Sequence, residues 1–331
     1  MDQSEPKSSK GSPFLKNIPK FFVFVILLAV VSAGLLYLIR VYHPASSGPE
    51  GFDAAYSVPE IVGRFAYAPI RESSGLAVSH CQDGVLWTHN DSGDLPLIYA
   101  AAPDGRHLGV WRVEGAEHID WEDIALTRTQ AGSCVLYIGE IGNNDRKRPG
   151  GIIYRFPEPV VSAEAASSTR EAPLTTERAD ALAFTYPGPP HDAEALIVHP
   201  KTGVIYIVTK EVETPASVYR IEPRFEIGEV NAEPHATVSL PSVPNGLVTA
   251  GDISPDGQRL ILTDYVAGYE FAILTGDPDL KNVWGTRPTV VDLGERTTGE
   301  SAAYGSDGRS ILSTGEMEHS PIFRVTAMPQ Q

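Results

Sequence analysis

The residues of this chain that could do chemistry are mostly carboxylates and side-chain amides, and they gather in three short motifs. These are His89-Asn90-Asp91-Ser92-Gly93, Asp120-Trp121-Glu122-Asp123 and Glu140-Ile141-Gly142-Asn143-Asn144. Hard oxygen ligands of this kind suit Ca²⁺ or Mg²⁺. Loop motifs this dense in polar groups usually do more than pack. The motifs predict a metal-assisted site or a ligand site that depends on a cation.

The segments around these motifs indicate a β protein. Short Val, Ile, Leu and Tyr runs alternate with Gly, Pro, Asp and Asn, and no helical periodicity persists beyond the N-terminal 40 residues. The runs align as five weak repeats, each starting with a carboxylate before an apolar strand. The five starting residues are Glu72, Glu122, Glu194, Asp252 and Glu300.

This arrangement predicts a five-bladed β-propeller, in which each repeat forms a four-stranded antiparallel sheet. The repeats start 50, 72, 58 and 48 residues apart, and the longest interval contains an Ala, Ser, Thr and Glu-rich stretch at 161–176 that we interpret as an exposed insertion. A six-bladed propeller remains the alternative if that stretch hides a further repeat. A β-sandwich or two small β domains would be the other interpretation. The run from Ile61 to Tyr67 is expected to complete the last blade and close the ring.

The propeller prediction places the polar residues around one mouth of a central channel. Innermost strands line the channel, and the ends of the second strands lie beside the starts of the first, because the strands are antiparallel. The candidate ligand-binding residues are Asn90, Asp91, Asp120, Glu122, Asp123, Glu140, Asn143, Asn144, Glu194, Lys210, Asp252, Asp264 and Glu300. The candidate metal ligands among them are Asp91, Glu122, Glu194 and Asp252, with Ca²⁺ as the expected ion.

The same residues have a purely structural interpretation. Each repeat-starting acid could accept hydrogen bonds from backbone N–H groups of the neighbouring blade. Lys210 could hold an anionic ligand or pair with Glu194, and His89 and His118 could be bases, metal ligands or ordinary loop histidines. No serine-nucleophile elbow, Walker loop or zinc-spaced Cys/His set is present.

The N-terminal region predicts a membrane anchor. Phe21 to Ile39 is an uncharged run of 19 residues, long enough as a helix to span about 30 Å of hydrocarbon. Four lysines precede it and Arg40 alone follows, which favours a cytoplasmic N-terminus. We therefore expect a cytoplasmic tail at 1–20, a transmembrane helix at 21–39, a linker at 40–57 and an extracytoplasmic propeller at 58–327. A cleaved signal peptide is the alternative, and it would export the same domain.

Charge and cysteine content fit an exported domain. The formal net charge is −16, which argues against binding to nucleic acid or anionic lipid. Cys81 and Cys134 are the only cysteines, and both are expected between the first and second strands of adjacent blades. That placement is compatible with a disulfide bond outside the cytoplasm.

Several motifs also resemble a known group of proteins. Leu86 to Gly93, Asp120 to Ala125, Asp192 to Leu196 and Gly251 to Gly257 resemble a widespread bacterial family of exported β-propellers, loosely described as WD-repeat-like or phytase-like. The resemblance covers about residues 60–326 and implies a propeller fold without a settled activity. The family's Asp-Ile-Gly-Asp-Asn is Glu140-Ile141-Gly142-Asn143-Asn144 here, and the Gly-His and Trp-Asp dipeptides of WD repeats are absent.

Two functions are therefore expected to compete. One is a binding or scaffold propeller for a small molecule, a glycan or a protein, with a divalent cation at the channel mouth. The other is a cation-dependent hydrolase of phosphoesters or esters, in which a metal activates water. Because the chain supplies no clear nucleophile or acid–base pair, the sequence favours the binding module.

Overall fold

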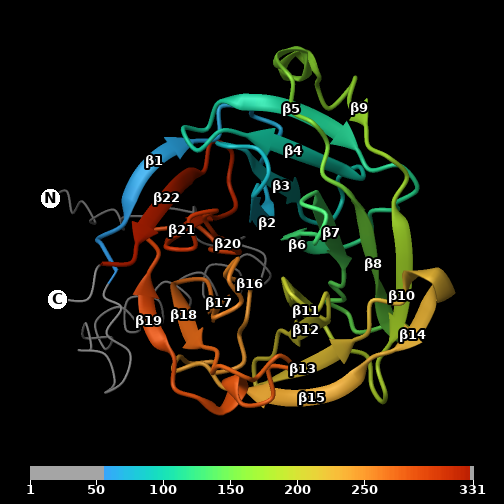
Figure 1. The fold of residues 1–331 in the computed structure, drawn as a ribbon, viewed down its shortest axis with the longest axis vertical. Coiled ribbons are helices and arrows are strands. Elements are labelled where there is room, and N and C mark those ends of the chain that lie inside the picture. The colour runs from blue at the N-terminus through green and yellow to red at the C-terminus, as the bar shows by residue number, and fades with distance from the viewer. Residues whose placement is uncertain (1–55, 329–331) are drawn as a thin grey trace, which may run out of the picture. The chain divides into compact units, whose positions relative to one another are not determined.

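The apolar runs of the sequence form short strands, and the strands form five sheets set around one central axis (Figure 1). The computed structural model describes residues 56–328. Each sheet has four antiparallel strands running from the axis outward, so the protein is a five-bladed β-propeller. The five-bladed prediction is confirmed, and the six-bladed alternative is wrong.

The first three blades follow each other along the chain. Blade 1 contains β2 (Ser73–Val78), β3 (Leu86–Asn90), β4 (Leu97–Ala101) and β5 (His107–Arg112). Blade 2 contains β6 (Trp121–Arg128), β7 (Cys134–Glu140), β8 (Gly150–Pro157) and β10 (Asp180–Thr185). Blade 3 contains β11 (Ala193–Val198), β12 (Ile205–Thr209), β13 (Ala216–Ile221) and β15 (Glu233–Val238).

The last two blades complete the ring, and blade 5 joins both ends of the described chain. Blade 4 contains β16 (Ala250–Ile253), β17 (Arg259–Thr263), β18 (Ala267–Ala272) and β19 (Thr289–Asp292). Blade 5 contains β20 (Ser301–Tyr304), β21 (Ser310–Thr314), β22 (Pro321–Thr326) and, outermost, β1 (Glu60–Arg64). Strand β1 pairs antiparallel with β22, as the sequence predicted for ring closure.

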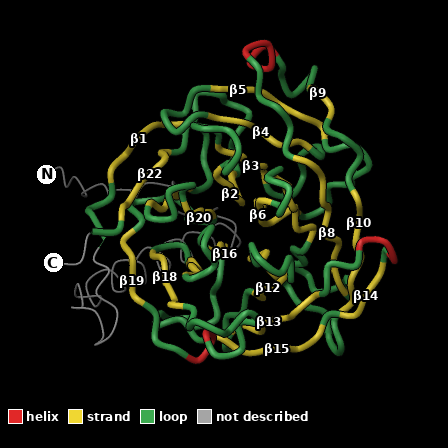
Figure 2. The backbone as a smooth tube through the Cα atoms, viewed as in Figure 1, coloured by secondary structure: helices red, strands yellow, loops and turns green. Residues whose placement is uncertain are grey.

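Two connections that lead to outermost strands add strands to the preceding blade. Between β8 and β10, the 3₁₀ helix η2 (Ala163–Ser167) is followed by β9 (Leu174–Thr175), which pairs in parallel with β5 of blade 1. Between β13 and β15, η3 (Phe225–Ile227) is followed by β14 (Glu229–Asn231), which pairs in parallel with β10 of blade 2. Both additions lie on the outside of the ring (Figure 2). The predicted insertion at 161–176 is therefore not a further blade.

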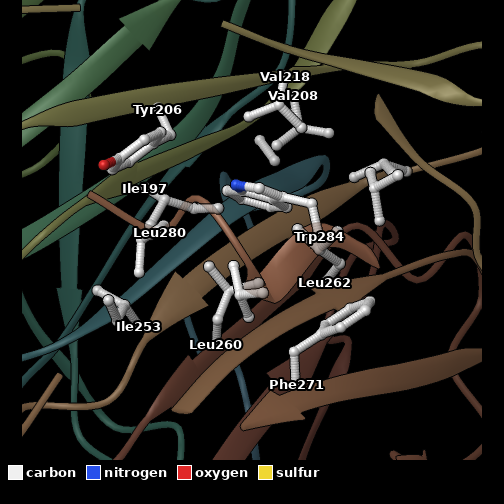
Figure 3. Packing of buried hydrophobic residues seen from close by; sticks show 14 of the residues in the cluster. Ile197, Tyr206, Val208, Val218, Ile253, Leu260, Leu262, Phe271, Leu280 and Trp284 are labelled. Atoms are coloured by element: carbon white, nitrogen blue, oxygen red, sulfur yellow. The ribbon is translucent and has the colours of Figure 1, made fainter. Parts of the chain in front are cut away.

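The core consists of apolar layers between neighbouring blades. Alternate residues of one strand point to opposite faces of its sheet. In β12, Ile205 and Ile207 pack between blades 2 and 3, whereas Tyr206 and Val208 pack between blades 3 and 4. Figure 3 shows the second of these layers, with Tyr206 and Trp284 of η4 (Val283–Gly285) among its aromatic residues. Because both sheet faces are buried, the strands are continuous apolar runs rather than alternating ones.

The propeller has two distinguishable faces. The innermost strands begin beside the ends of the second strands, as in the pairs Trp121 with Glu140 and Ser301 with Thr314. We call this side the upper face and the opposite side the lower face. A disulfide bond between Cys81 and Cys134 joins blades 1 and 2 at the lower face, and this is the cysteine pair that the sequence proposed.

The predicted transmembrane helix at 21–39 and nearly all of the predicted linker lie outside the described residues. Between residues 56 and 328, no helix has the length and hydropathy needed to cross a bilayer.

Candidate functional site

Two glutamates lie at matching irregularities of the innermost strands. In β6 the pairing with β7 shifts between Trp121 and Asp123, and in β11 the pairing with β12 shifts between Ala193 and Ala195. Glu122 and Glu194 are the residues skipped by these bulges. A β-bulge redirects the side chain that it carries. Both glutamates are consequently buried, each with 2% of its surface exposed.

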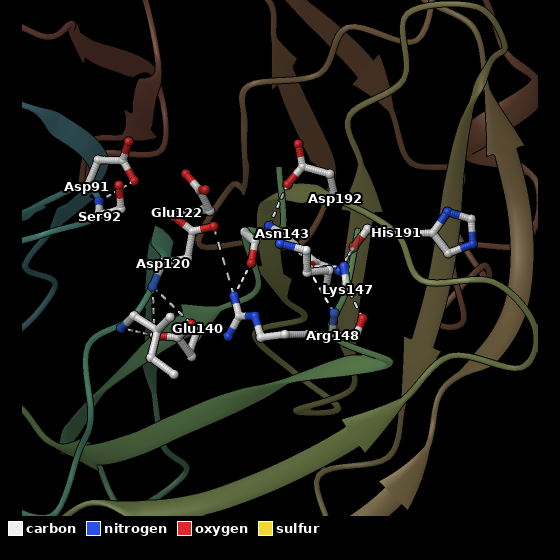
Figure 4. Close-up of polar contacts among 12 residues, drawn as sticks. Asp91, Ser92, Asp120, Glu122, Glu140, Asn143, Lys147, Arg148, His191 and Asp192 are labelled. Carbon is white, nitrogen blue, oxygen red and sulfur yellow. Dashed lines mark hydrogen bonds and ion pairs between the residues drawn. The ribbon is translucent and has the colours of Figure 1, made fainter. Parts of the chain in front are cut away.

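These glutamates belong to a compact group of carboxylates from three blades. Asp91, Asp120 and Glu122 have ligand oxygens within 4.8 Å of one another, and so do Glu122, Asp192 and Glu194. We call these five residues the acidic cluster. Figure 4 shows four of its members, Asp91, Asp120, Glu122 and Asp192. Because Glu122 belongs to both groups, it joins them into one site.

The sequence prediction missed Asp192 as a site residue. The signal was present, because Asp192-Ala193-Glu194 repeats the spacing of Asp120-Trp121-Glu122. Asp192 is 7% exposed, and its Oδ1 accepts a hydrogen bond of 2.7 Å from the backbone N–H of Asn143. Each Asp-x-Glu pair therefore supplies one acid just before the inner strand and a second at the bulge.

Burial and mutual repulsion disfavour the ionised form of the cluster. Burial raises the pKa of Glu122 well above its usual value, and the nearby Glu194, Asp91 and Asp120 carboxylates add to the effect. Burial also raises the pKa of Glu194 to about 7, although Lys210 opposes this shift. The pKa of Asp120 rises to about 6, through burial first and then repulsion by Asp91. Without a cation, Glu122 and Glu194 can relieve this repulsion by sharing a proton.

One oxygen of the cluster has no partner. Lys210 Nζ lies 2.6 Å from Glu194 Oε1, which is the pairing that the sequence gave as one alternative for this lysine. Glu194 Oε2, however, is buried and accepts no hydrogen bond from any described residue. A buried carboxylate oxygen without a donor is unfavourable and calls for a cation or a proton.

Gly142 leaves room for two side chains of the acidic cluster because it has no Cβ. An added Cβ at this position would lie 1.9 Å from Glu122 Oε1 and 2.7 Å from Asp120 Cγ. The glycine follows β7 and donates its backbone N–H to the Asp120 carbonyl at 3.2 Å. It therefore allows the β7–β8 loop to approach both acids closely.

The donor set fits a hard divalent cation. Ca²⁺ binds oxygen ligands at about 2.3–2.6 Å, so ligands on opposite sides of the ion are about 5 Å apart. The 4.8 Å limit within each group of carboxylates is compatible with that spacing. Asp91 and Asp120 are half-buried, whereas the other three members are buried. The three buried members would thus hold a bound ion from the inside of the propeller. A further ligand could reach the ion from the side of Asp91 and Asp120.

The side chains of four other predicted site residues form hydrogen bonds that stabilise loops. Asn90 Oδ1 accepts from the Glu72 N–H, and Asn143 Oδ1 accepts from the Arg148 N–H. The remaining two are acids: Glu140 accepts from two backbone N–H groups and from Arg148, and Asp264 accepts from two backbone N–H groups and from Tyr269. These contacts are structural, although the sequence offered a structural alternative only for the five repeat-starting acids.

Asp123 and Asp252 lie below the acidic cluster in the centre of the propeller. Asp123 Oδ2 accepts from the Leu196 N–H at 2.9 Å and the Gly251 N–H at 3.3 Å, and so bridges blades 2, 3 and 4. Asp252 Oδ2 accepts from the Tyr304 N–H at 2.7 Å. This geometry gives no support to the prediction of Asp252 as a metal ligand. Asp252 lies two residues after the first residue of β16, and its carboxylate accepts a hydrogen bond from backbone instead.

Glu300 and Asn144 complete the predicted ligand-binding set, and His89 was a further candidate. Glu300 is 6% exposed, and burial together with repulsion by Glu194 raises its pKa to about 10. Asn144 is exposed. His89 is fully buried, and burial lowers its pKa to about 4, so it is a neutral core residue.

Comparison with known proteins adds little to this picture. No protein-family profile and no curated protein sequence matches the chain. Among solved structures, a gluconolactonase of Xanthomonas campestris matches with 12% identity and a TM-score of 0.41, covering 87% of this chain and 99% of its own. A structural-genomics target named as a candidate gluconolactonase matches with 12% identity and a TM-score of 0.43, covering 86% and 97%. At this similarity the propeller assignment rests on the sheet topology, and the predicted phytase-like or WD-repeat-like relationship gains no support.

Proposed function

We propose that this protein is an exported, membrane-anchored propeller that binds a divalent cation, Ca²⁺ first, in its acidic cluster and holds an extracytoplasmic ligand through that ion. The observation that carries the proposal is the buried pair Glu122 and Glu194. Lys210 compensates one oxygen of this pair, and Glu194 Oε2 has no donor among the described residues. A divalent cation would compensate the rest.

The charge balance of the site favours a neutral ligand. Five carboxylates against Lys210, Arg148, which lies 3.9 Å from Asp120, and one divalent cation still leave an excess of negative charge. Phosphate groups would be repelled from such a surface, whereas hydroxyl oxygens can enter the coordination shell of Ca²⁺ without a charge penalty. We therefore favour a hydroxyl-rich small molecule or glycan as the ligand.

A cation-dependent hydrolase of neutral esters is the second candidate. Asp91 and Asp120 lie on the less buried side of the cluster, where an acid–base group would be needed. This candidate predicts turnover of ester substrates that requires the cation and is lost in Asp120→Asn. Binding of a glycan without turnover of an ester panel would eliminate it.

The export and anchoring part of the proposal rests on the sequence. The uncharged run at 21–39 with lysines before it supports an anchor with a cytoplasmic N-terminus. The Cys81–Cys134 disulfide supports an oxidising compartment, because such bonds are rare in the cytosol.

Calcium titration followed by thermal unfolding tests the cation site. Saturating Ca²⁺ at about 100 times its Kd adds about 2.7 kcal/mol, which corresponds to a rise of several degrees in Tm. Glu122→Gln should remain folded and lose most of this rise. Asp145→Asn is the matched control, because Asp145 is an exposed acid of the neighbouring loop that pairs with Lys147. An unchanged Tm with Ca²⁺, Mg²⁺, Mn²⁺ and Zn²⁺ would sink the proposal.

A further inference from the structure

The connection between β8 and β10 leaves its own blade and lies along the outer edge of blade 1 (Figure 1). Strand β9 pairs with β5, and Ser168 accepts from His107 through its carbonyl at 3.0 Å and from the Val110 N–H through its Oγ at 2.8 Å. This anchoring brings Arg170 to the loop between β3 and β4, which carries Asp91.

Arg170 binds a buried acid of that loop. Its Nε and Nη2 lie 2.9 and 2.6 Å from Asp94 Oδ1. The Asp94 side chain is only 6% exposed, and its Oδ2 accepts from Asn90 Nδ2 and from the Tyr99 hydroxyl, both at 2.7 Å. Charge-assisted hydrogen bonds of this kind are among the stronger polar contacts in proteins.

Asn90 connects Asp94 to the backbone next to the acidic cluster. Its Oδ1 accepts from the backbone N–H groups of Arg71 and Glu72 at 3.0 and 3.2 Å. The next residue, Asp91, donates its own N–H to the Glu72 carbonyl at 2.9 Å. Asp94 and Asn90 together therefore fix the backbone from which the Asp91 side chain extends.

In blade 4 the corresponding loop acid is held without an ion pair to its carboxylate. This acid, Asp264, accepts from Val266 N–H, Ala267 N–H and the Tyr269 hydroxyl. Within residues 56–328, no arginine or lysine side chain forms an ion pair with the Asp264 carboxylate. Blade 4 instead has Arg296, whose Nη2 lies 3.5 Å from the Asp264 backbone carbonyl, so of these two blades only blade 1 pairs the carboxylate of its loop acid with an arginine.

We infer that Arg170 is a positioning residue for the cation site: it fixes Asp94, which through Asn90 holds the loop that presents Asp91. The inference rests on the proposed function, because it assigns a role in cation binding. Asp91 is a half-buried member of the cluster and extends from a loop, so its position depends on support from outside blade 1.

Calcium affinity of the full chain, measured by isothermal titration calorimetry, tests the inference. Arg170→Met should weaken Ca²⁺ binding about tenfold, at the lower end of the effect of outer-shell partners on metal sites. Arg178→Met is the matched control in the same connection, because Arg178 is exposed and pairs only with Glu114 at 3.5 Å, and it should bind as the wild type does. Arg170→Lys should recover part of the affinity. Tighter binding by Arg170→Met would overturn the inference, because it would mean that the released Asp94 charge matters more than the loop.

A double-mutant cycle separates positioning from a general loss of structure. In an Asp94→Asn background Arg170 has no charge to hold, so adding Arg170→Met should change affinity less than twofold. An equal loss in both backgrounds would contradict the inference. If the wild type binds no cation at all, the proposed function fails, and hydrogen exchange then decides the positioning step. Unchanged exchange of residues 90–94 in Arg170→Met would overturn it, whereas faster exchange would support it.

Discussion

Gly142 allows the β7–β8 loop to approach Asp120 and Glu122, the acid that joins the two halves of the cluster. Gly142→Ala would place a methyl group against Glu122 Oε1 and the Asp120 carboxylate, both of which would have to move. We expect the Ca²⁺ affinity to fall at least tenfold while the protein stays folded, since Gly142 has an ordinary φ. Isothermal titration with each variant measures this change.

Gly285→Ala is the matched control for this substitution. Gly285 also has an ordinary φ, and an added Cβ there meets no atom within 4 Å. Its Ca²⁺ affinity should equal that of the wild type. Undiminished affinity in Gly142→Ala would show that Glu122 and Asp120 do not bind the ion together.

The raised pKa values predict opposite pH effects on the free and the cation-bound protein. Glu194 has its pKa raised to about 7 in the fold, so its contribution to stability is full below about 4.5 and is lost as pH rises through about 7. The Tm without cation should therefore fall between pH 5 and 8. Because a cation needs ionised ligands, the Ca²⁺-induced rise in Tm should grow over the same interval.

Differential scanning calorimetry at several pH values, with Ca²⁺ or a chelator, checks this prediction. Glu194→Gln removes the titrating group, so its cation-free Tm should depend less on pH than that of the wild type. A Ca²⁺ effect that is larger at pH 5 than at pH 8 would contradict the assignment of carboxylates as ligands.

Sequence patterns predicted the individual site residues only in part. Glu122 and Glu194 could be predicted because each is a carboxylate at the start of an apolar strand. Asp252 looks the same in sequence but bonds to Tyr304 N–H, because β16 begins at Ala250 and its pairing with β17 has no bulge before Asp252. Register and bulges depend on the neighbouring strand, which a local pattern does not contain.

At the scale of elements, the disulfide covalently links two blades that also meet through apolar packing and hydrogen bonds. Cys81 lies between β2 and β3, Cys134 begins β7, and the two are 53 residues apart in sequence. Replacing both by serine should lower the free energy of unfolding by about 2–4 kcal/mol, because the unfolded chain gains freedom. Guanidinium unfolding measures the change, and a loss below about 1 kcal/mol would contradict it.

The same substitution should leave cation binding intact. The disulfide lies at the lower face and the acidic cluster at the upper face, so Ca²⁺ affinity in native buffer should remain within twofold of the wild type. A larger loss would show that the bond also positions the upper loops.

The strands of the blades were largely predictable, but the additions to their edges were not. A continuous apolar run such as 205–209 is typical of a strand buried on both faces. Strands β9 and β14 have only two and three residues, and both pair with a different blade. Their existence depends on the edge that they cover, so it follows from the assembled ring and not from their own sequence.

At the scale of the whole molecule, four of the five blades are contacted by a segment that belongs to the next part of the ring. Blades 1 and 2 receive β9 and β14, and η4 of blade 4 packs against β15 of blade 3. The segment before β1 reaches blade 4 through the Tyr56 hydroxyl, which lies 2.5 Å from Glu270 Oε1. Covered edges cannot pair with strands of other molecules, which protects a β protein from aggregation.

Tyr56 forms an isolated bridge with Ala327, beyond the end of β22, so both ends of the described chain meet at the lower face. The acidic cluster opens at the upper face, about one strand length of 17–20 Å away. Residues 56–328 captured on a biosensor chip through a tag at either end of that segment would therefore keep the cluster turned toward the flowing solution. Glycan libraries could then be passed over the immobilised propeller with and without calcium, and the attachment itself would block neither the ion nor the sugar.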